Sequence, residues 1–432
     1  MAGSSRAIRA NVVDADQRVP ALVVKVGRYP IHAGGLGVAR SLGRLGVPVH
    51  VITEDPLTPL ALSRYRARRF GWPDPDPGRP EALVAGLIEI GNRIGTRSIA
   101  IPTDDEAAIL LAEHADVLSE RFLLPDVRPG LLRKLASKQQ LFLLCREHDV
   151  PAPDTSVVSS RAELLSYSRN ATFPLVVKNA DPWTRLYAPV VCSTRVLRTR
   201  DELVALADSR HDEFRLVVQE HLPEEHAEDW FVHAYFGANS ECVVRFTGVK
   251  THSWPVGGGV TACGYSVLNP ALADLTERFC KAVGYQGVAD LDWRFDRRDG
   301  QYKLVDFNPR VGAQFALFST SSELDVVRAL HLDLTGRNIA VGEQRYGRRI
   351  IVEPFYLSAR LLGRKAAAAA PDLAEPRVTT VFGIGAPDDP LPFLAVWPRL
   401  VWPTMLRLAR LLLPRRRLSR QPAAAPDARG AA

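Results

Sequence analysis

The chain has few cysteines and no long hydrophobic run. Its 432 residues include five cysteines (Cys145, Cys192, Cys242, Cys263 and Cys280), an odd number with no CxxC pair. This pattern argues against a disulfide framework or a zinc ribbon and favours a reducing compartment. No run reaches the roughly 18 apolar residues of a spanning helix. No compact apolar segment precedes Pro20, so we expect no signal peptide and a cytoplasmic protein.

Positive charge is concentrated at one end of the chain. The formal net charge is +7, and residues 391–432 contain eight arginines against a single acid, Asp427. That tail accounts for the whole excess, and the remainder is close to neutral. A general nucleic-acid surface needs basic residues spread over a domain, so we expect no nucleic-acid partner.

The first third of the chain has the pattern of a parallel sheet. After polar residues 1–19, which we expect to be disordered, "PALVVKVG" and "VPVHVIT" are typical of strands and "HAGGLGVARSLGRLG" of a helix between them. Strand–helix–strand at this spacing indicates a βαβ unit. The glycines Gly34, Gly35 and Gly37 do not form GxGxxG, so a dinucleotide site is not favoured. A third strand and a second helix follow in "RSIAIPTDDEAAILLAEHADVL", with Thr103 or Asp104 as the N-cap of the helix.

The character of the sequence changes near Arg128. "LLRKLASKQQLFLLCREHDV" predicts one amphipathic helix, and "TFPLVVKNA" and "RLVVQEHLPE" predict strands. "DWFVHAYFG" and "CVVRFTGVK" are typical of adjacent antiparallel strands. "GVADLDWRF" and "YKLVDFNPR", joined by "DRRDGQ", predict a hairpin.

That hairpin carries the most informative polar residues. A turn centred on Asp299 pairs Asp296 with Tyr302, Arg294 with Leu304, and Asp292 with Asp306. Alternation along the second strand places Asp306, Asn308 and Arg310 on one face. It places Val305 and Phe307 in the core, and Pro309 ends the strand because it cannot donate to the ladder.

Two aspartates across a strand pair need a cation. Like charges in this position are destabilising, and carboxylate and amide oxygens suit Mg²⁺. Asp292, Asp306 and Asn308 are therefore candidate metal ligands, and Arg310 would hold phosphate oxygens. The alternative is that Arg310 neutralises both aspartates with no metal present.

Two lysines add to the candidate site. Lys178 ends the apolar run "FPLVVK", where a buried ammonium needs an anionic partner. Lys138 lies on the polar face of the preceding helix. Together with the hairpin and the glycine loop "PVGGGV", they favour a nucleoside triphosphate site.

These residues, in this order, resemble the ATP-grasp superfamily over about residues 20–340. "DLDWRF" followed by "VDFNPR" is similar to the family's acid and acid-x-Asn-x-Arg, and "PLVVK" to the strand whose lysine contacts the nucleotide. "VVQEHL" is similar to the hinge between the lobes. The resemblance implies ATP-binding residues Lys138, Lys178, Gln219, Glu220, Leu222 and Asp229, metal ligands Asp292, Asp306 and Asn308, and catalytic residues Lys250 and Arg310.

The resemblance also implies the fold, of class α/β and α+β. We expect a Rossmann-like pre-ATP-grasp domain, a two-lobed ATP-grasp domain and a C-terminal helical extension. The expected divisions are 1–19 (disordered N-terminus), 20–128 (pre-ATP-grasp), 129–345 (ATP-grasp, hinge near 219–222), 346–390 (linker and C-terminal segment) and 391–432 (basic amphipathic tail).

The activity implied is ATP-dependent ligation of a small carboxylate to an amine, or to a thiol, through an acylphosphate. ATP and Mg²⁺ (or Mn²⁺) are the implied cofactors, and carboxylate–amine ligases such as D-aspartate ligase-like members are the nearest in type. A homodimer is left open. Two departures favour an alternative, an ATP-binding regulatory module without turnover. Both metal positions are Asp where the family usually has Glu, and the phosphate loop "NADPWTRLYAPVVCS" contains no glycine.

The tail admits two interpretations. Residues 391–420 combine arginines with tryptophans and leucines and are interrupted by prolines. They are similar in type to an interfacial segment that binds the anionic inner face of a membrane. The alternative is a C-terminal helix packed on the enzyme.

Overall fold

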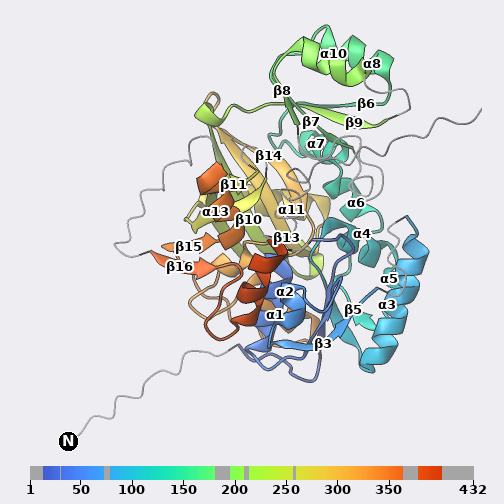
Figure 1. The fold of residues 1–432 in the computed structure, drawn as a ribbon, viewed down its shortest axis with the longest axis vertical. Coiled ribbons are helices and arrows are strands. Elements are labelled where there is room, and N and C mark those ends of the chain that lie inside the picture. The colour runs from blue at the N-terminus through green and yellow to red at the C-terminus, as the bar shows by residue number, and fades with distance from the viewer. Residues whose placement is uncertain are drawn as a thin grey trace, which may run out of the picture.

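Three β-sheets organise the molecule (Figure 1). The computed structural model describes residues 13–29, 31–72, 78–180, 195–208, 214–255, 259–362 and 378–400. In the view of Figure 1 a four-stranded sheet lies at the top, a seven-stranded sheet in the middle, and the N-terminal sheet at the bottom.

The N-terminal sheet is entirely parallel, in the order β3-β2-β1-β4-β5. All four residues of β1 are buried, as expected for a strand with helices on both faces of its sheet. This confirms the predicted βαβ unit. Asp104 caps α4, accepting a hydrogen bond from the Ala107 N–H at 2.9 Å. The elements are β1 (Ala21–Val24), α1 (Ala33–Gly43), β2 (Val49–Ile52), α2 (Pro59–Leu62), β3 (Arg66–Phe70), α3 (Pro80–Ile94), β4 (Ser98–Pro102), α4 (Asp105–Glu113), α5 (Ala115–Leu118) and β5 (Phe122–Leu123).

The helix predicted after Arg128 is divided into two. α6 (Leu131–Ala136) ends at Ser137, which adopts an extended conformation and caps α7 (Lys138–Glu147). A serine that competes for backbone hydrogen bonds favours a cap over a helix interior, which explains the break. Lys138 is consequently the first residue of α7.

The four-stranded sheet is antiparallel, in the order β6-β9-β7-β8. Its hydrophobic core includes Leu164 of α8, Leu203 of α10, and Val177 and Val218 of the strands, so the helices pack on the sheet. The elements are β6 (Thr155–Val158), α8 (Arg161–Ser168), β7 (Leu175–Asn179), β8 (Arg195–Leu197), α10 (Arg200–Asp208) and β9 (Leu216–Glu220).

The seven-stranded sheet has the order β14-β13-β10-β11-β12-β15-β16 and is antiparallel except between β15 and β16. The segment 346–390, expected as a linker and C-terminal segment, supplies its last two strands. The elements are η1 (Glu224–His226), β10 (Ala227–Phe236), η2 (Ala238–Ser240), β11 (Cys242–Trp254), β12 (Val260–Ser266), α11 (Pro270–Val283), β13 (Gly287–Asp296), β14 (Gln301–Asn308), η3 (Phe315–Leu317), α12 (Val326–Leu334), β15 (Arg348–Ile351), α13 (Glu353–Leu362) and β16 (Thr379–Phe382).

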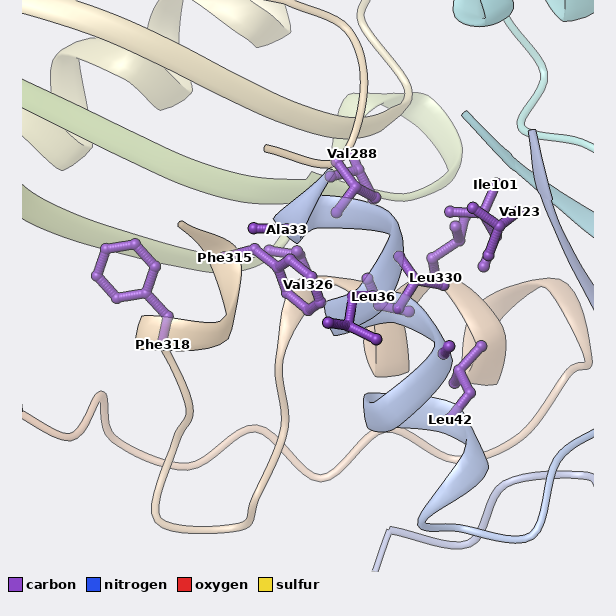
Figure 2. Close-up of a cluster of buried hydrophobic side chains, with 14 of the residues drawn as sticks. Val23, Ala33, Leu36, Leu42, Ile101, Val288, Phe315, Phe318, Val326 and Leu330 are labelled. Atoms are coloured by element: carbon purple, nitrogen blue, oxygen red, sulfur yellow. The ribbon is translucent and has the colours of Figure 1, made fainter. Parts of the chain in front are cut away.

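A shared hydrophobic core joins the N-terminal sheet to the seven-stranded sheet. Figure 2 shows α1 with Leu36 and Leu42 beside Phe315, Val326 and Leu330 of the later chain. A Cβ added at Gly37 would lie 2.6 Å from the Phe315 ring, so only glycine permits this approach. The two sheets are therefore held in a fixed relation around the loop that follows β14.

Both ends of the described chain pack on this core. Val13, Ala15 and Val19 contact it, and Asp16 lies 3.0 Å from Arg337, so the last part of the segment expected to be disordered is placed. Residues 1–12 lie outside the described residues.

The start of the basic tail also lies on the body. Residues 391–400 are helical, Val396 is fully buried, and Arg399 forms a bidentate ion pair with Asp55 at 2.9 and 2.8 Å. For residues 391–400 the structure therefore agrees with the second interpretation of the tail, a C-terminal helix packed on the rest of the protein. Residues 401–432 lie outside the described residues, and within the described part no helix is long and apolar enough to cross a membrane.

Candidate active site

A pocket lies between the four-stranded and seven-stranded sheets and gathers most of the predicted site residues. Its walls come from β7 and β9 on one side and from β10, β11, β13 and β14 on the other. Among its lining residues are Lys178, Gln219, Glu220, Leu222, Asp229, Lys250, Asp292 and Asp306. Residues that lie far apart in the sequence therefore meet in one cavity.

The β13–β14 hairpin pairs Asp292 with Asp306, as the sequence predicts, but the register nearer the turn differs from the predicted one. Near the turn the strands pair one residue away from the prediction: Asp296 faces Gln301, and Trp293 faces Leu304. An irregularity in the ladder then absorbs the extra residue, Val305.

This β-bulge corrects the prediction for Val305. A bulge leaves one residue unpaired and re-aims the side chains beside it. Val305 is half-buried and lines the pocket, whereas Phe307 is fully buried as predicted. β14 ends at Asn308, directly before Pro309, also as predicted.

Each of the paired aspartates contacts a lysine. The Lys250 Nζ lies 3.1 Å from Asp292 Oδ1, and the Lys138 Nζ contacts Asp306 Oδ1. Burial tends to raise the pKa of Asp306, but the charges of Lys138 and Lys178 outweigh it and hold that pKa below its usual value. Asp306 is thus kept ionised within the pocket, and Asp292 has a cation beside it.

Lys178 has an environment suited to anion binding. Burial, followed by the nearby positive charge of Lys138, lowers the pKa of its ammonium to about 8. A further anion in the pocket would relieve this cost, because it would supply the charge partner that the buried ammonium needs. The loop after β7, residues 181–194 with Arg185, lies outside the described residues.

The donor set fits a hard divalent cation. Asp292 and Asp306 present carboxylate oxygens to the pocket, and such oxygens suit Mg²⁺. Asn308 is buried and its Nδ2 donates a hydrogen bond to the Asp290 carbonyl at 3.0 Å, which places it behind the pocket wall. In the described part of the chain there is no cluster of three His, Cys, Asp or Glu residues of metal-binding geometry. The site is therefore a pair of carboxylates with two lysines beside it.

Arg310 pairs with two acids that the sequence analysis missed, and its charge also acts on Asp292 and Asp306. Its guanidinium contacts Asp290, and its Nε lies 3.4 Å from Asp105 Oδ1. Asp290 is 2% exposed and also lies 3.2 Å from the His233 Nε2. Arg310 thus neutralises Asp290 and reaches the start of α4. The signal for Asp290 was the alternation in "ADLDW", which puts it on the same face as Asp292.

The strand that leads into the expected hinge has its side chains engaged. The Gln219 Nε2 donates to Oγ1 of Thr155 at 2.9 Å, so this side chain is held by its cross-strand neighbour on β6. Asp229, one of the predicted ATP-binding residues, lies 3.2 Å from the Arg294 Nε. Arg294 and Trp230 also line the pocket and were not predicted.

Comparison with known proteins gives one curated relative in sequence. No family model matches the chain. The chain is 24% identical over 308 residues to D-aspartate ligase of Enterococcus faecium, a match that covers 68% of this chain and 72% of that protein.

Solved structures share the fold at low sequence identity. N5-carboxyaminoimidazole synthetase from Staphylococcus aureus aligns with a TM-score of 0.56 at 11% identity, covering 78% of this chain and 82% of the other. L-amino acid ligase from Bacillus licheniformis aligns with a TM-score of 0.55 at 15% identity, covering 74% and 75%. The biotin carboxylase domain of Hydrogenobacter thermophilus 2-oxoglutarate carboxylase, crystallised as a dimer with MgADP and bicarbonate, aligns with a TM-score of 0.55 at 14% identity, covering 76% and 73%.

The predicted resemblance is therefore confirmed. The chain shares the fold of these synthetases, ligases and carboxylases, and it is similar in sequence to a D-aspartate ligase, as the resemblance to the ATP-grasp superfamily implied.

Proposed function

We propose that the chain is an ATP-dependent carboxylate–amine ligase. The observation that carries the proposal is the pocket itself. Lys178, Lys250 and the pair Asp292–Asp306 converge there from both sheets, beside the strand end at Glu220. The D-aspartate ligase relative supports a small carboxylate as one substrate. A thiol acceptor in place of the amine remains within the same reaction class.

The reaction would bring together two negatively charged groups. The γ-phosphoryl group of ATP passes to a carboxylate oxygen, giving ADP and an acylphosphate, and the amine then displaces phosphate. Catalysis of such a transfer is mostly positioning and charge neutralisation. Lys178 and Lys138 would bind phosphate oxygens, and Lys250 would face the transferred group. The backbone of 220–222 would receive adenine, and Asp229 the ribose.

The metal would bind at the paired aspartates. Asp292 and Asp306 would hold Mg²⁺, or Mn²⁺, with Asn308 as a third candidate ligand; the ion, when bound, neutralises charge on the phosphate oxygens. Lys138 and Lys250 would move from these carboxylates toward the nucleotide. Arg310 would act on the carboxylate side of the pocket, with its guanidinium fixed by Asp290.

The same proposal gives the domains their roles. The order β3-β2-β1-β4-β5 matches the first five strands of the doubly wound nucleotide-binding sheet, which supports a Rossmann-like domain before the grasp. The four-stranded sheet and the seven-stranded sheet would be the two lobes that close on ATP, with the hinge at 219–222.

The first test is release of ADP from MgATP by the purified chain against pooled carboxylates and amines. We expect a signal that depends on both pools and falls by at least about 10²-fold in Asp306→Asn and Lys178→Met, because each removes a charge that acts on the transferred group. Arg161→Gln is a matched control, since Arg161 pairs with Asp208 on exposed helices outside the pocket. Clear ATP binding with no release from any pool would favour the alternative, a regulatory module without turnover.

A second proposal concerns the tail. We propose that residues 401–420 attach the enzyme to an anionic membrane surface on the cytoplasmic side. Six arginines and no acid occur there, interleaved with Trp402 and leucines, and anionic lipids attract such segments. The deletion that tests this should begin after Leu400, because Arg399 and Val396 pack on the body. Unchanged co-sedimentation of the shortened protein with phosphatidylserine vesicles would contradict it.

A homodimer is a further proposal, supported by the dimeric biotin carboxylase domain with the same fold. Light scattering at two protein concentrations tests it.

A further inference from the structure

The segment between β9 and β10 is held from outside the pocket by the tip of the β13–β14 hairpin. The Arg298 Nη2 donates to Glu220 Oε1 at 3.0 Å. Its neighbour Arg297 donates through Nη2 to Glu228 Oε1 at 2.8 Å and through its backbone N–H to the His226 carbonyl at 2.7 Å. Two consecutive arginines of the hairpin turn thus hold both ends of the segment Glu220–Glu228.

Arg298 is fixed in place by its own strand. Its Nε lies 2.9 Å from Asp296 Oδ1 and its Nη2 lies 2.6 Å from Asp296 Oδ2, a bidentate pair. Lys303 shares this carboxylate at 2.9 Å, and its Nζ lies 3.9 Å from Glu220. A planar guanidinium that is bound through two of its nitrogens to one carboxylate loses little further conformational freedom when it binds a second carboxylate. Glu220 is therefore docked against a rigid site.

The other end of the hairpin reaches the opposite side of the same pocket. β13 and β14 carry Asp292 and Asp306, and Arg294 of β13 lies 3.2 Å from Asp229. One hairpin thus touches the expected phosphate end, the expected ribose acid and the expected adenine end of the nucleotide site. Its tip belongs to one sheet, and Glu220 to the other.

We propose that Arg298, supported by Lys303, is a positioning residue that fixes Glu220 and thereby sets the hinge backbone for the nucleotide base. The inference rests on the proposed function, because it assigns a role at the proposed ATP site. Arg298 does not line the pocket, so it acts through Glu220, which does.

The exposure of the pair separates this role from simple stabilisation. The side chains of Arg298 and Glu220 are 42% and 34% exposed. Ion pairs of this kind add little to the free energy of unfolding. Glu220→Gln should therefore weaken nucleotide binding with little change in melting temperature. Arg298→Gln also removes a partner of the buried Asp296, which keeps its ion pair with Lys303.

A double-mutant cycle on Arg298→Gln and Glu220→Gln tests the proposal. The Kd of MgADP is measured by calorimetry for the full chain, with the melting temperature recorded for each variant. Both substitutions remove the charge and keep a polar side chain. Arg161→Gln serves as the control, since it breaks a different exposed ion pair, that of Arg161 with Asp208. We expect each single variant to bind MgADP up to about fivefold more weakly, the upper end of the range for an exposed ion pair.

The double variant decides the mechanism. If Arg298 acts through Glu220, the double variant binds no more weakly than either single variant, because both remove the same interaction. Losses that multiply, or an Arg298→Gln protein that binds like wild type, would overturn the inference and leave the proposed function standing. A wild-type protein that binds neither MgADP nor MgATP would overturn both.

Discussion

At the scale of single residues, the lysine of β7 gives the pocket a pH response. Burial, then the charge of Lys138, lowers the pKa of Lys178 to about 8. Its ammonium is the form that can bind phosphate, so protonation and nucleotide binding are coupled. At a pH above this pKa the free protein must first take up a proton.

We expect the Kd of MgADP to rise about tenfold from pH 7 to pH 9, since the protonated fraction falls by one decade per pH unit above the pKa. A guanidinium stays charged over this range, so the Lys178→Arg variant should show a flat profile. Calorimetry at both pH values makes the comparison. The same pH slope in both proteins would show that another group titrates.

At the scale of elements, the C-terminal segment is tied to α1 by a buried ion pair. Asp389 accepts from the Arg40 Nε at 2.9 Å, the Ser63 Oγ at 2.7 Å and the Arg64 backbone N–H at 2.9 Å. The side chains of Arg40 and Asp389 are 6% and 1% exposed. The next acid, Asp388, pairs with Arg44 at the surface.

We expect Asp389→Ala to lower the free energy of unfolding by about 3 kcal/mol, because it leaves the buried Arg40 guanidinium with backbone carbonyl partners but no opposite charge. The neighbouring Asp388→Ala should cost less than about 1 kcal/mol, since the side chains of Arg44 and Asp388 are 43% and 39% exposed and water can replace the lost pair. Urea unfolding of the two variants measures the difference. Equal losses would mean that the buried pair does not anchor the segment.

At the same scale, the sequence predicted elements better than the breaks within them. The strands and helices on which Lys178, Lys250 and Asp292 lie follow from hydrophobic periodicity and turn signals. The division of α6 from α7 at Ser137 and the bulge at Val305 do not, because each depends on how neighbouring elements pack. The acid Asp290 was within reach of the alternation in its strand, but its partner Arg310 had been assigned to phosphate.

At the scale of the whole molecule, packing holds many histidines in the neutral form. Burial is the largest cause of a lowered pKa at each of six histidines, and it brings that of His32 to about 3. The six are His32, His50, His221, His233, His252 and His331. Their folded-state pKa values lie below the unfolded value of about 6.5. The stability that they contribute is complete above that value and is lost as the pH falls, because the unfolded chain takes up protons first.

We expect the melting temperature to fall between pH 7.5 and pH 5, a window in which most carboxylates stay ionised. The raised pKa of Asp104, about 7 through burial and the nearby Glu106, acts in the opposite direction and offsets the contribution of about one of these histidines. His32→Gln removes one titrating group and should flatten the profile. An unchanged profile in that variant would show that the pKa of His32 is the same in the folded and the unfolded chain.

The parallel N-terminal sheet and the β13–β14 hairpin could be predicted from the sequence, whereas the packing of the two ends of the described chain on the shared core could not. The parallel sheet and the hairpin follow from local patterns, and the pocket brings together eight of the predicted residues. The packing of both chain ends on the shared core depends on contacts across more than 300 positions, such as Arg40 with Asp389. No local pattern carries such a pairing.

The extra residue at Val305 has a consequence for how this site can change over evolution. The bulge divides the hairpin into a part near the turn and a part at the acid pair. The two parts have hydrogen-bond registers that differ by one residue. A chain without Val305 could preserve the Trp293–Leu304 pairing in the core or the Asp292–Asp306 pairing at the pocket, but not both. Gain or loss of one codon at this place would therefore disrupt either the core pairing or the acid pair. An alignment gap there would mark a related protein whose site differs from this one.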